Sequence, residues 1–430
     1  MENLRVIADL HIHSCYSRAT SKRMHIEEIA KFAKIKGLNL VGTGDFTHPK
    51  WLKELQEVLI FEPDISLYKL AENPESPVHF MVTTEVNTMF TFEKEAKRIH
   101  HVILTPSIET AFQINERLAK YGDLTIDGRP TLNMSAPQLV EEVMEASSDN
   151  MIFPAHAWTP WFSIFGAFSG FDTVEDCYQD MTKHIYALET GLSSDPPMNW
   201  RLSRLDRFAL VSNSDSHSFW PWRIGREANV FQLRRLSYHE VLDAIRFKNQ
   251  DRFKFTIETD PAYGKYHWTG HRNCGVSLSP AEAIRLGNIC PVCRKKLTKG
   301  VEQRVEELAD RPAGFKPQGA TGCLHLLPLS EIITAVLRVD SPYTQAVWSV
   351  YNALVERFGD EYSVLINASK EALKGVVDAN IAESIVRVRE GLVTVVPGYD
   401  GVYGCLNISE GATEKSVVGR VGQLNLADFV

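Results

Sequence analysis

The chain has 430 residues, too many for one ordinary hydrophobic core, so we expect two or three domains. Its 44% hydrophobic and 23% charged residues, with no signal segment and no run near the roughly 20 apolar residues of a membrane helix, predict a cytoplasmic protein without membrane contact. The net charge of −8 argues against a nucleic-acid binder without excluding one, because bound divalent metals would change the local field.

Strands and helices alternate in the first half of the chain. Short apolar, β-branched runs predict seven strands, at residues 5–13, 40–46, 79–87, 100–106, 150–158, 185–191 and 208–217. Helical spacing predicts a helix at 25–37, which ends on a glycine, and another at 135–148, which opens with a cap and a proline. This alternation favours a mostly parallel sheet, and about seven such units favour a closed barrel, which we place at residues 1–257.

Metal-ligand side chains follow most of these strands where the strand ends, which is the edge that carries the active site in βα barrels. In chain order they are His11 and His13, Asp45, Glu85, His156, Glu189, and Asp215 with His217, whereas the fourth strand instead begins with His100 and His101. Asp9, His11 and His13 share one face of an extended strand. Imidazole and carboxylate groups suit Zn, Mn or Fe, and a carboxylate such as Glu85 can bridge two metals for phosphoryl displacement.

Aromatic loops follow His156 and His217, beside the predicted metals. They hold Trp158, Trp161, Phe162, Trp220 and Trp222. These rings can stack on a flipped or single-stranded base, or else pack the loops against the next domain. Close by, Arg201 and Arg204 offer contacts to a phosphate backbone, although an ordinary helix surface explains them equally well.

A cysteine-rich module is expected at residues 258–310. His271 and Cys274 are separated by two residues, as are Cys290 and Cys293, and fifteen residues separate the pairs. This spacing predicts a structural, tetrahedral zinc site that does no chemistry, with His267 as the alternative to His271.

The rest of the chain predicts a mainly helical domain at 311–415 and a flexible tail at 416–430. A Pro/Gly-rich linker at 311–322 precedes helical patterns at 329–337, 343–359 and 380–391. In the tail, Gln423, Leu426 and Phe429 fit the spacing Q-x-x-L-x-x-F, with Val430 where a second aromatic is usual. This looks like a PIP box, which implies docking on the sliding clamp PCNA by a helix-in-groove mode.

The strand-end motifs together resemble the PHP (polymerase and histidinol phosphatase) domain. They are HxH at the N-terminus, TGD, TTE, a histidine on the fourth strand, PAH and SDSH. The resemblance implies a distorted (β/α)7 barrel with two or three metals. It matches His11, His13, Glu85 and Asp215 to the first metal, Glu85, His101 and His156 to the second, and Asp45 and His217 to the third.

The chain departs from that family's pattern at two places. Many members read TDH on the second strand, where this chain has Thr43, Gly44 and Asp45, so the third metal is in question. Many also carry an acid or histidine shortly after HxHS, where this chain has Arg18, which can instead bind a phosphate.

His100 is an alternative to His101 as a ligand of the second metal.

The order of barrel, zinc module, helical domain and clamp-binding tail, with ETGLSSDPPMNWRLS at 189–203, resembles the archaeal endonuclease Q family over essentially the whole chain. The resemblance implies a DNA repair endonuclease that cuts 5′ to deaminated bases (uracil, hypoxanthine, xanthine) or abasic sites, with Zn2+ and with Mg2+ or Mn2+ for catalysis. The alternatives are a PHP small-molecule phosphatase acting on histidinol phosphate or a nucleotide, and a clamp-associated DNA-binding protein with an inactive PHP site.

Overall fold

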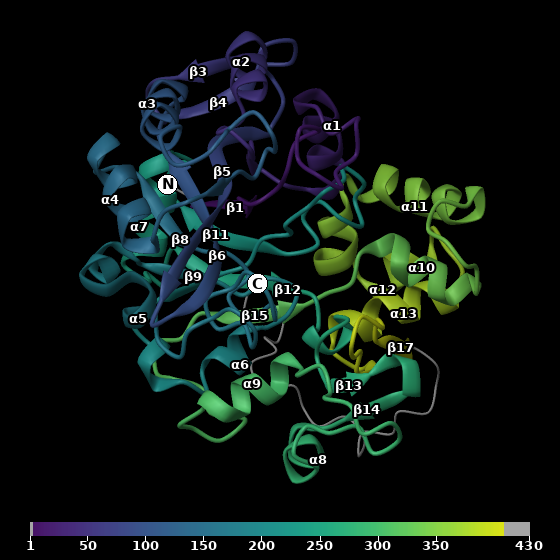
Figure 1. Cartoon of the computed structure of the whole chain (residues 1–430). Coiled ribbons are helices and arrows are strands. Elements are labelled where there is room, and N and C mark those ends of the chain that lie inside the picture. The colour runs from purple at the N-terminus through teal and green to yellow at the C-terminus, as the bar shows by residue number, and fades with distance from the viewer. Residues whose placement is uncertain (1–2, 408–430) are drawn as a thin grey trace.

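The computed structural model describes residues 3–407 (Figure 1). Seven of its strands form a ring. In order around the ring they are β1 (Leu4–Asp9), β2 (Leu40–Gly42), β5 (His79–Phe92), β6 (Glu95–Thr105), β8 (Met151–Pro154), β9 (Ala187–Glu189) and β10 (Ala209–Val211). The bridge between Ile152 and Ile185 joins β8 to the β9 segment, and the bridge between Ile12 and Ser216 closes the ring. Each predicted strand overlaps one of these elements, so the predicted barrel is confirmed.

One ring strand, β6, runs against its neighbours. It forms an antiparallel hairpin with β5 and also pairs antiparallel with β8. Its first half therefore lies at the barrel end where the parallel strands finish. This reversal explains why the fourth predicted strand begins, rather than ends, with its histidines, and it is the distortion of the barrel.

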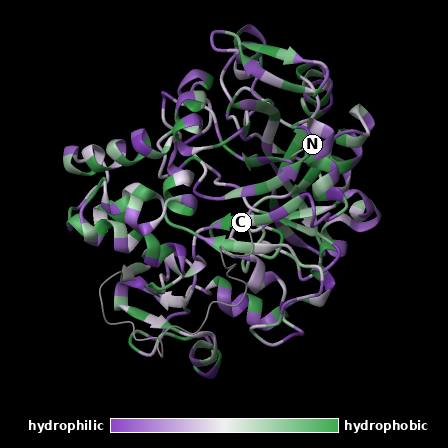
Figure 2. Ribbon diagram, turned by 180° about the vertical axis from the view of Figure 1, so that it is seen from behind, coloured by the Kyte–Doolittle hydropathy of each residue, from purple (hydrophilic) through white to green (hydrophobic). Residues whose placement is uncertain are grey.

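Helices cover the outside of the ring. They are α1 (Ile26–Lys36), α2 (Pro49–Val58), α3 (Ile108–Leu118), α4 (Ala136–Ala146), α5 (Val174–Tyr178), α6 (Pro196–Asn199) and α7 (Tyr238–Arg246). The two predicted helices are confirmed: α1 ends at Gly37, whose φ of 97° suits glycine, and Ser135 and Gln138 form a capping box at the start of α4. Figure 2 shows the strands largely hydrophobic and the helices mixed, as a buried sheet under amphipathic helices requires.

The sheet extends beyond the ring through strands that the sequence patterns did not predict. They are β11 (Ala228–Leu233), β12 (Phe253–Glu258) and β15 (Gly322–His325) on one side, and β3 (Leu59–Glu62), β4 (Leu67–Leu70) and β7 (Thr131–Leu132) on the other. β15 pairs parallel with β12, so residues expected in the helical domain return to the barrel sheet. The boundaries proposed from composition thus cut across one physical unit.

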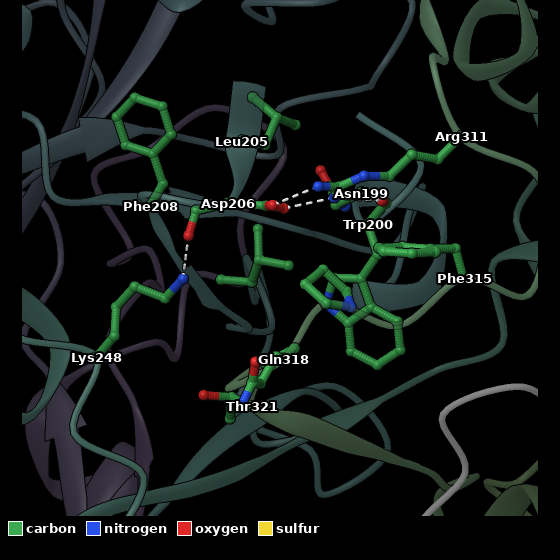
Figure 3. Close-up of a pocket in the computed structure, with 13 residues that line it drawn as sticks. Asn199, Trp200, Leu205, Asp206, Phe208, Lys248, Arg311, Phe315, Gln318 and Thr321 are labelled. Atoms are coloured by element: carbon green, nitrogen blue, oxygen red, sulfur yellow. Dashed lines mark hydrogen bonds and ion pairs between the residues drawn. The ribbon is translucent and has the colours of Figure 1, made fainter. Parts of the chain in front are cut away.

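The Pro/Gly-rich segment before β15 is held against the barrel (Figure 3). The Arg311 guanidinium forms two hydrogen bonds, of 2.7 and 2.6 Å, with the Asp206 carboxylate, and its cation lies over the ring of Phe315. Lys248 donates to the Asp206 carbonyl, and a cavity of about 260 Å³ remains between these groups and Trp200. Because Arg311 is paired with Asp206 of the barrel, this segment is fixed to the barrel surface and is not a flexible linker.

The cysteine-rich module lies at the lower edge in Figure 1 and contains β13 (Thr269–His271), β14 (Val276–Leu278), α8 (Pro280–Arg285) and α9 (Val301–Leu308). A hairpin far along the chain, β16 (Thr394–Val396) with β17 (Cys405–Asn407), joins it through the bridge between Trp268 and Tyr399. The C-terminal part of the described chain therefore completes this module.

The helical region beside the barrel consists of α10 (Leu329–Leu337), α11 (Gln345–Phe358), α12 (Lys370–Lys374) and α13 (Ala379–Arg389), with a π-turn at Ser363–Asn367. The three helices predicted at 329–337, 343–359 and 380–391 are confirmed as α10, α11 and α13. A buried ion pair ties this region to the barrel, with 2.7 Å between Lys36 Nζ and Glu361 Oε1. Within residues 3–407, no helix has the length and apolar character needed to cross a membrane.

Replacing Glu361 by alanine is expected to lower the free energy of unfolding by about 3–5 kcal/mol, because it leaves the buried Lys36 ammonium uncompensated. Tyr351 and the backbone N–H of Leu329 would lose their acceptor as well. Urea unfolding followed by circular dichroism measures the change. Glu383→Ala breaks the exposed pair with Lys370 and is the control, with little effect expected. A loss as small as that of the control would contradict the prediction.

Candidate metal centre

Two groups of possible metal ligands share Glu85 at the end of the barrel where the parallel strands finish. The first comprises His11, His13, Glu85 and Asp215, and the second Glu85, His100 and His156, with the ligand atoms of each group within 4.8 Å of one another. Separate segments of the ring supply these side chains. The fold brings them together although two of them, His11 and Asp215, are 204 residues apart in the sequence. The fold thus gathers at one edge what the sequence distributes along the strands of the ring.

Glu85 presents one carboxylate oxygen to each group. Its Oε2 lies 3.2 Å from His13 Nε2 and 3.6 Å from His11 Nε2. Its Oε1 lies 2.8 Å from His100 Nδ1 and 3.1 Å from His156 Nε2. Glu85 could therefore contribute a ligand atom to a metal ion in each group.

The donor atoms fit metal ions better than they fit one another. His11 Nε2 is buried and has no hydrogen-bond partner within the part of the chain that the structure describes. His100 Nδ1 and His156 Nε2 lie only 3.2 Å apart and face the same oxygen of Glu85. Buried ring nitrogens converging on carboxylates form a donor set for first-row divalent ions.

Two further carboxylates orient the histidines of the first group. His11 Nδ1 donates to Glu189 at 3.0 Å, and His13 Nδ1 donates to Asp45 Oδ1 at 2.9 Å. Each bond turns the opposite ring nitrogen, Nε2, towards Glu85. Glu189 was expected among the metal-capable side chains at the strand ends but was matched to no metal, and its sequence position does not distinguish an orienting carboxylate from a ligand.

Both carboxylate oxygens of Asp45 accept hydrogen bonds, and one of these bonds orients His13. This does not favour the third metal site that was expected from Asp45 and His217. Asp45 Oδ2 accepts from the backbone N–H of Ser14 at 2.6 Å and from the hydroxyl of Ser17 at 2.9 Å. His217 Nδ1 donates to the backbone carbonyl of Asp215 at 2.9 Å, and its ring lies 4.4 Å from that of His13. Among residues 3–407 the two do not form a group of ligands.

His101 lies outside the centre, and His100 takes the place expected for it. His101 Nε2 bonds with Thr88 Oγ1 at 2.8 Å, and its Nδ1 bonds with the Tyr178 hydroxyl at 2.7 Å. Adjacent residues of a strand point to opposite faces, so only one of the two histidines can face Glu85. Burial lowers the pKa of His101 to about 3, which keeps its ring neutral.

The electrostatics differ between the ligands: although burial opposes it, neighbouring carboxylates raise the pKa of His11, His13 and His156, so a metal ion would displace protons from these rings. Burial alone would raise the pKa of Glu85, but His100, Arg129 and His11 hold it well below its usual range. Burial opposes ionisation of Asp215 too, yet its histidine neighbours lower the pKa. For His100, burial lowers the pKa to about 4. The carboxylates thus stay charged and His100 stays neutral.

Backbone conformation at the strand ends is unusual. Asp45, His156 and Asp215 have φ values of 48°, 29° and 47°, in the left-handed region that side chains rarely adopt. Gly191 packs against His156 so closely that a Cβ there would lie 2.6 Å from the His156 Cβ. Asp9 accepts hydrogen bonds from the backbone N–H groups of Ser214 and Gly225, which holds the Asp215 segment in place. Such local strain is typical of functional sites.

Arg129 is a residue of the centre that sequence reasoning missed. Its guanidinium lies 3.0 Å from Glu85 Oε2. It precedes the two-residue strand β7, in a loop without any recognisable motif, so only the tertiary structure brings it here. Arg18 in contrast is 74% exposed and pairs with Asp127, so it does not face the ligands.

A cavity of about 630 Å³ opens beside the centre. His156, Asp215 and His217 lie along it, and its other residues include Arg223, Arg226, Lys265, Tyr266 and Tyr403. The cations come from the loop before β11 and from the cysteine-rich module, whereas Tyr403 comes from the segment before β17. A chain with a net charge of −8 therefore has a locally basic cavity next to its metal ligands.

The tryptophans expected to bind substrate mostly serve packing. Trp158 is buried and donates from Nε1 to Asn199. Trp220 and Trp222 stack on each other and make tilted ring contacts with Trp348, so they join the barrel to the helical region. Their apolar surface gains more from that interface than from the rim of a cavity. Trp161 is 37% exposed and contacts Phe168 and Tyr266, at the edge of the cavity.

The two arginines expected on a phosphate backbone hold α9 to the barrel. Arg201 pairs with Glu306 at 2.6 Å, and Arg204 donates to the carbonyl of Leu308 at 3.2 Å. Both therefore stabilise the junction with the cysteine-rich module. Gln423, Leu426 and Phe429 lie outside the described residues.

The second candidate metal site lies in the cysteine-rich module. His271, Cys274, Cys290 and Cys293 converge there, with 3.3 Å between His271 Nδ1 and Cys293 Sγ, and we call these four residues the thiolate site. His267 instead faces Glu302, at 3.3 Å, which favours His271 as the fourth ligand. Although burial opposes it, backbone N–H groups of Cys293 and Val292 lower the pKa of Cys290 to about 6 and favour the thiolate that a metal binds.

Replacing Glu189 by glutamine is expected to weaken metal binding at the barrel centre about 10- to 100-fold, because His11 loses the carboxylate that orients it. Titration of the metal-stripped protein with Mn2+, followed by calorimetry, measures the affinity. Glu175→Gln changes an exposed carboxylate of α5 and is the control. Equal affinities for both variants would show that Glu189 does not position the ligand.

A barrel with two groups of metal ligands around one carboxylate, and a separate thiolate site, defines a class of metal-binding barrel proteins. Two solved structures resemble the chain over nearly its whole length. The lesion-specific endonuclease PfuEndoQ from Pyrococcus furiosus is 33% identical with a TM-score of 0.85, over 98% of this chain and 100% of that one. An endonuclease Q in complex with a 27-mer duplex, with an abasic lesion at its active site, is 34% identical with a TM-score of 0.83, over 96% and 98%. The chain belongs to the endonuclease Q family, a family of nucleases, which are hydrolases that act on DNA.

The chain also resembles a family profile and two uncharacterized proteins. The family profile described as the MJ0043 C-terminal domain matches residues 328–392, the helical region. The uncharacterized protein MJ0043 of Methanocaldococcus jannaschii is 31% identical over 254 residues, which are 58% of this chain but only 31% of that protein. The uncharacterized protein YqxK of Bacillus subtilis is 27% identical over 413 residues, 93% of this chain and 98% of that one.

Proposed function

We propose that this chain is a metal-dependent DNA repair endonuclease that hydrolyses the phosphodiester on the 5′ side of a damaged nucleotide. The observation that carries the proposal is the position of Glu85 between two groups of ligands, beside an open basic cavity, in a chain of the endonuclease Q family. The solved relative with an abasic lesion at its active site supports damaged DNA as the substrate class.

The residues of the centre have separate roles in this reaction. Divalent ions held by the two groups around Glu85 would activate water and offset the charge that develops on the phosphate oxygens. Glu189 and Asp45 orient His11 and His13, the two imidazoles that would hold the first ion. The Arg129 guanidinium, beside Glu85, is placed to donate to a phosphate oxygen, a role that we expected for Arg18.

The damaged nucleotide would leave the duplex and enter the 630 Å³ cavity, whose size is typical of pockets for small ligands. Tyr266 and Tyr403 offer rings for stacking, in place of the tryptophans that pack elsewhere. Extrusion costs less for a base that is mispaired or absent, which favours uracil, hypoxanthine, xanthine and abasic sites over normal bases.

The metal assignments follow the chemistry of the donors. The thiolate site supports a structural Zn2+, because thiolates prefer zinc over harder ions. The imidazole and carboxylate groups of the barrel support Zn2+ together with Mg2+ or Mn2+ during catalysis.

Labelled duplexes carrying uracil, hypoxanthine, xanthine, an abasic site or no lesion, incubated with Mg2+ or Mn2+, test the activity. We expect a nick 5′ to each lesion and none in the undamaged duplex. The Asp215→Ala variant should bind the same duplexes but leave them intact, because it lacks a ligand of the first group. Hydrolysis of a chromogenic phosphate ester or histidinol phosphate without nicking of DNA would point to a phosphatase, and DNA binding without any hydrolysis would point to an inactive PHP site.

The tail supports a further partner. Gln423, Leu426 and Phe429 have the spacing of a PIP box, which would bring the nuclease to the sliding clamp PCNA at sites of DNA synthesis. A synthetic peptide of residues 416–430 should bind the clamp, and the same peptide with Leu426 and Phe429 replaced by alanine should not.

A further inference from the structure

Two cations of the cavity lack acidic partners. Arg223 and Arg226 line it three residues apart, and neither forms an ion pair among residues 3–407. Arg226 donates one bond, of 3.2 Å, to the carbonyl of Ser214, while its Nε is buried without a partner. Glu331, Glu227 and Asp215 act on these arginines electrostatically, but none of the three forms an ion pair with them among the described residues.

This arrangement leaves two positive charges close together. Burial lowers the pKa of Arg226, and the charge of Arg223 lowers it further. In the cavity of Figure 3, by contrast, Asp206 already binds both Arg311 and Lys248. A buried polar atom without a partner and a pair of cations that repel each other are features of a site that receives an anion.

The cavity itself indicates which anion would bind. Arg226 is tied to Ser214, the residue before the ligand Asp215, so its guanidinium lies next to the metal centre. Phosphates of one DNA strand follow each other every 3.4 Å or so along the helix axis, and arginine is suited to bind them through paired hydrogen bonds. A strand with its scissile phosphate at Glu85 would therefore bring a neighbouring phosphate to the arginine pair.

We propose that Arg223 and Arg226 form a second phosphate site, which binds the DNA phosphate next to the scissile one on the same strand. The proposal rests on the endonuclease function proposed above and deepens it. Phosphates held on both sides of the extruded nucleotide require that nucleotide to be internal. The site thus favours cleavage within a strand over removal of a terminal nucleotide.

Arg223→Gln and Arg226→Gln, combined with uncharged methylphosphonate linkages, test the site. A uracil duplex carries one such linkage at a time, at the positions on either side of the scissile phosphate. On the ordinary duplex we expect each variant to lower kcat/KM about 10- to 100-fold, mainly through KM. At one of the two adjacent positions, the methylphosphonate should lower kcat/KM of the wild type by a similar factor. It should not lower kcat/KM of the variants any further, because they already lack the arginine that binds that phosphate. Arg234→Gln, an exposed arginine just beyond the far end of β11, is the matched control and should lose nothing.

Binding measurements separate the possible failures. The Asp215→Ala protein, with and without each arginine variant, is titrated against the same duplexes by fluorescence anisotropy, and removal of the site should reduce the slope of log affinity against log salt by about 1. The second phosphate site alone would be overturned if the wild type nicks the duplexes but the loss from each arginine substitution multiplies with the loss from the uncharged linkage at every position. Wild type that neither nicks nor binds any lesion duplex would overturn the proposed function and this site with it. Arg226→Lys, which keeps a donor for Ser214, checks that a loss is not merely structural.

Discussion

The Glu85→Gln variant is expected to nick lesion-containing DNA on the order of a thousandfold more slowly than the wild type. The amide keeps the size of the side chain but removes the charge that both groups of ligands share. It also leaves the Arg129 guanidinium without its carboxylate. Because one residue serves both groups, both should lose their metal, whereas Asp215→Asn should weaken the first group alone. Metal analysis of the purified proteins, beside the nicking rates, distinguishes these results.

Glu95→Gln is the matched control for this variant. Glu95 lies in the same β5–β6 hairpin, is exposed and bonds only with Lys97 among the described residues, so its loss should change neither metal content nor rate. The metal of the thiolate site should remain in both variants, because that site is separate from the barrel. A Glu85→Gln protein with full metal content and normal nicking would remove the centre from the reaction.

Replacing Cys290 by serine is expected to release the metal of the thiolate site and unfold the module around it. Structural zinc contributes about 10–16 kcal/mol to the folding of zinc-finger peptides, and this module has few buried apolar side chains of its own. Limited proteolysis should then cut between residues 264 and 300 in the variant but not in the wild type. Because Lys265 and Tyr266 line the cavity, DNA binding should weaken as well.

Cys405→Ser provides the comparison for the cysteine-rich module. That thiol is exposed and lies in β17, outside the thiolate site, so the variant should keep its metal and resist the protease. Chelation of the wild type should reproduce the Cys290→Ser pattern, and added Zn2+ should restore the wild type only. Resistance of a metal-free Cys290→Ser protein would show that the module folds without the metal.

Local patterns were enough to predict the barrel and its working edge. Short apolar runs indicate the strands, because a strand that is buried on both faces needs apolar side chains on both of them. Metal ligands at the ends of the parallel strands come close together, since a closed ring brings the ends of its parallel strands to one rim. The short spacing of the two ligand pairs in the cysteine-rich module similarly implies one site, because the chain between the ligands of each pair is too short to separate them.

The orientation of the ligand side chains, and the residues with which they form hydrogen bonds, depend on contacts between distant parts of the chain. Sequence cannot tell whether His100 or His101 faces Glu85, because the answer depends on the reversed direction of β6 in the ring. Nor can it show that Asp45 orients His13, or that the loop before β7 brings Arg129 to Glu85.

The sequence by itself determined a seven-stranded barrel, a set of candidate ligands at its rim, a separate cysteine-rich group and a helical region. Only the tertiary structure decided which ligands share Glu85, that Trp220 and Trp222 join two parts of the molecule, and that Arg223 and Arg226 are left without acidic partners among the described residues. The physical reason is range: strand and helix patterns record burial along a few neighbouring residues, whereas hydrogen bonds, ion pairs and aromatic contacts are settled by packing between segments that the sequence keeps far apart.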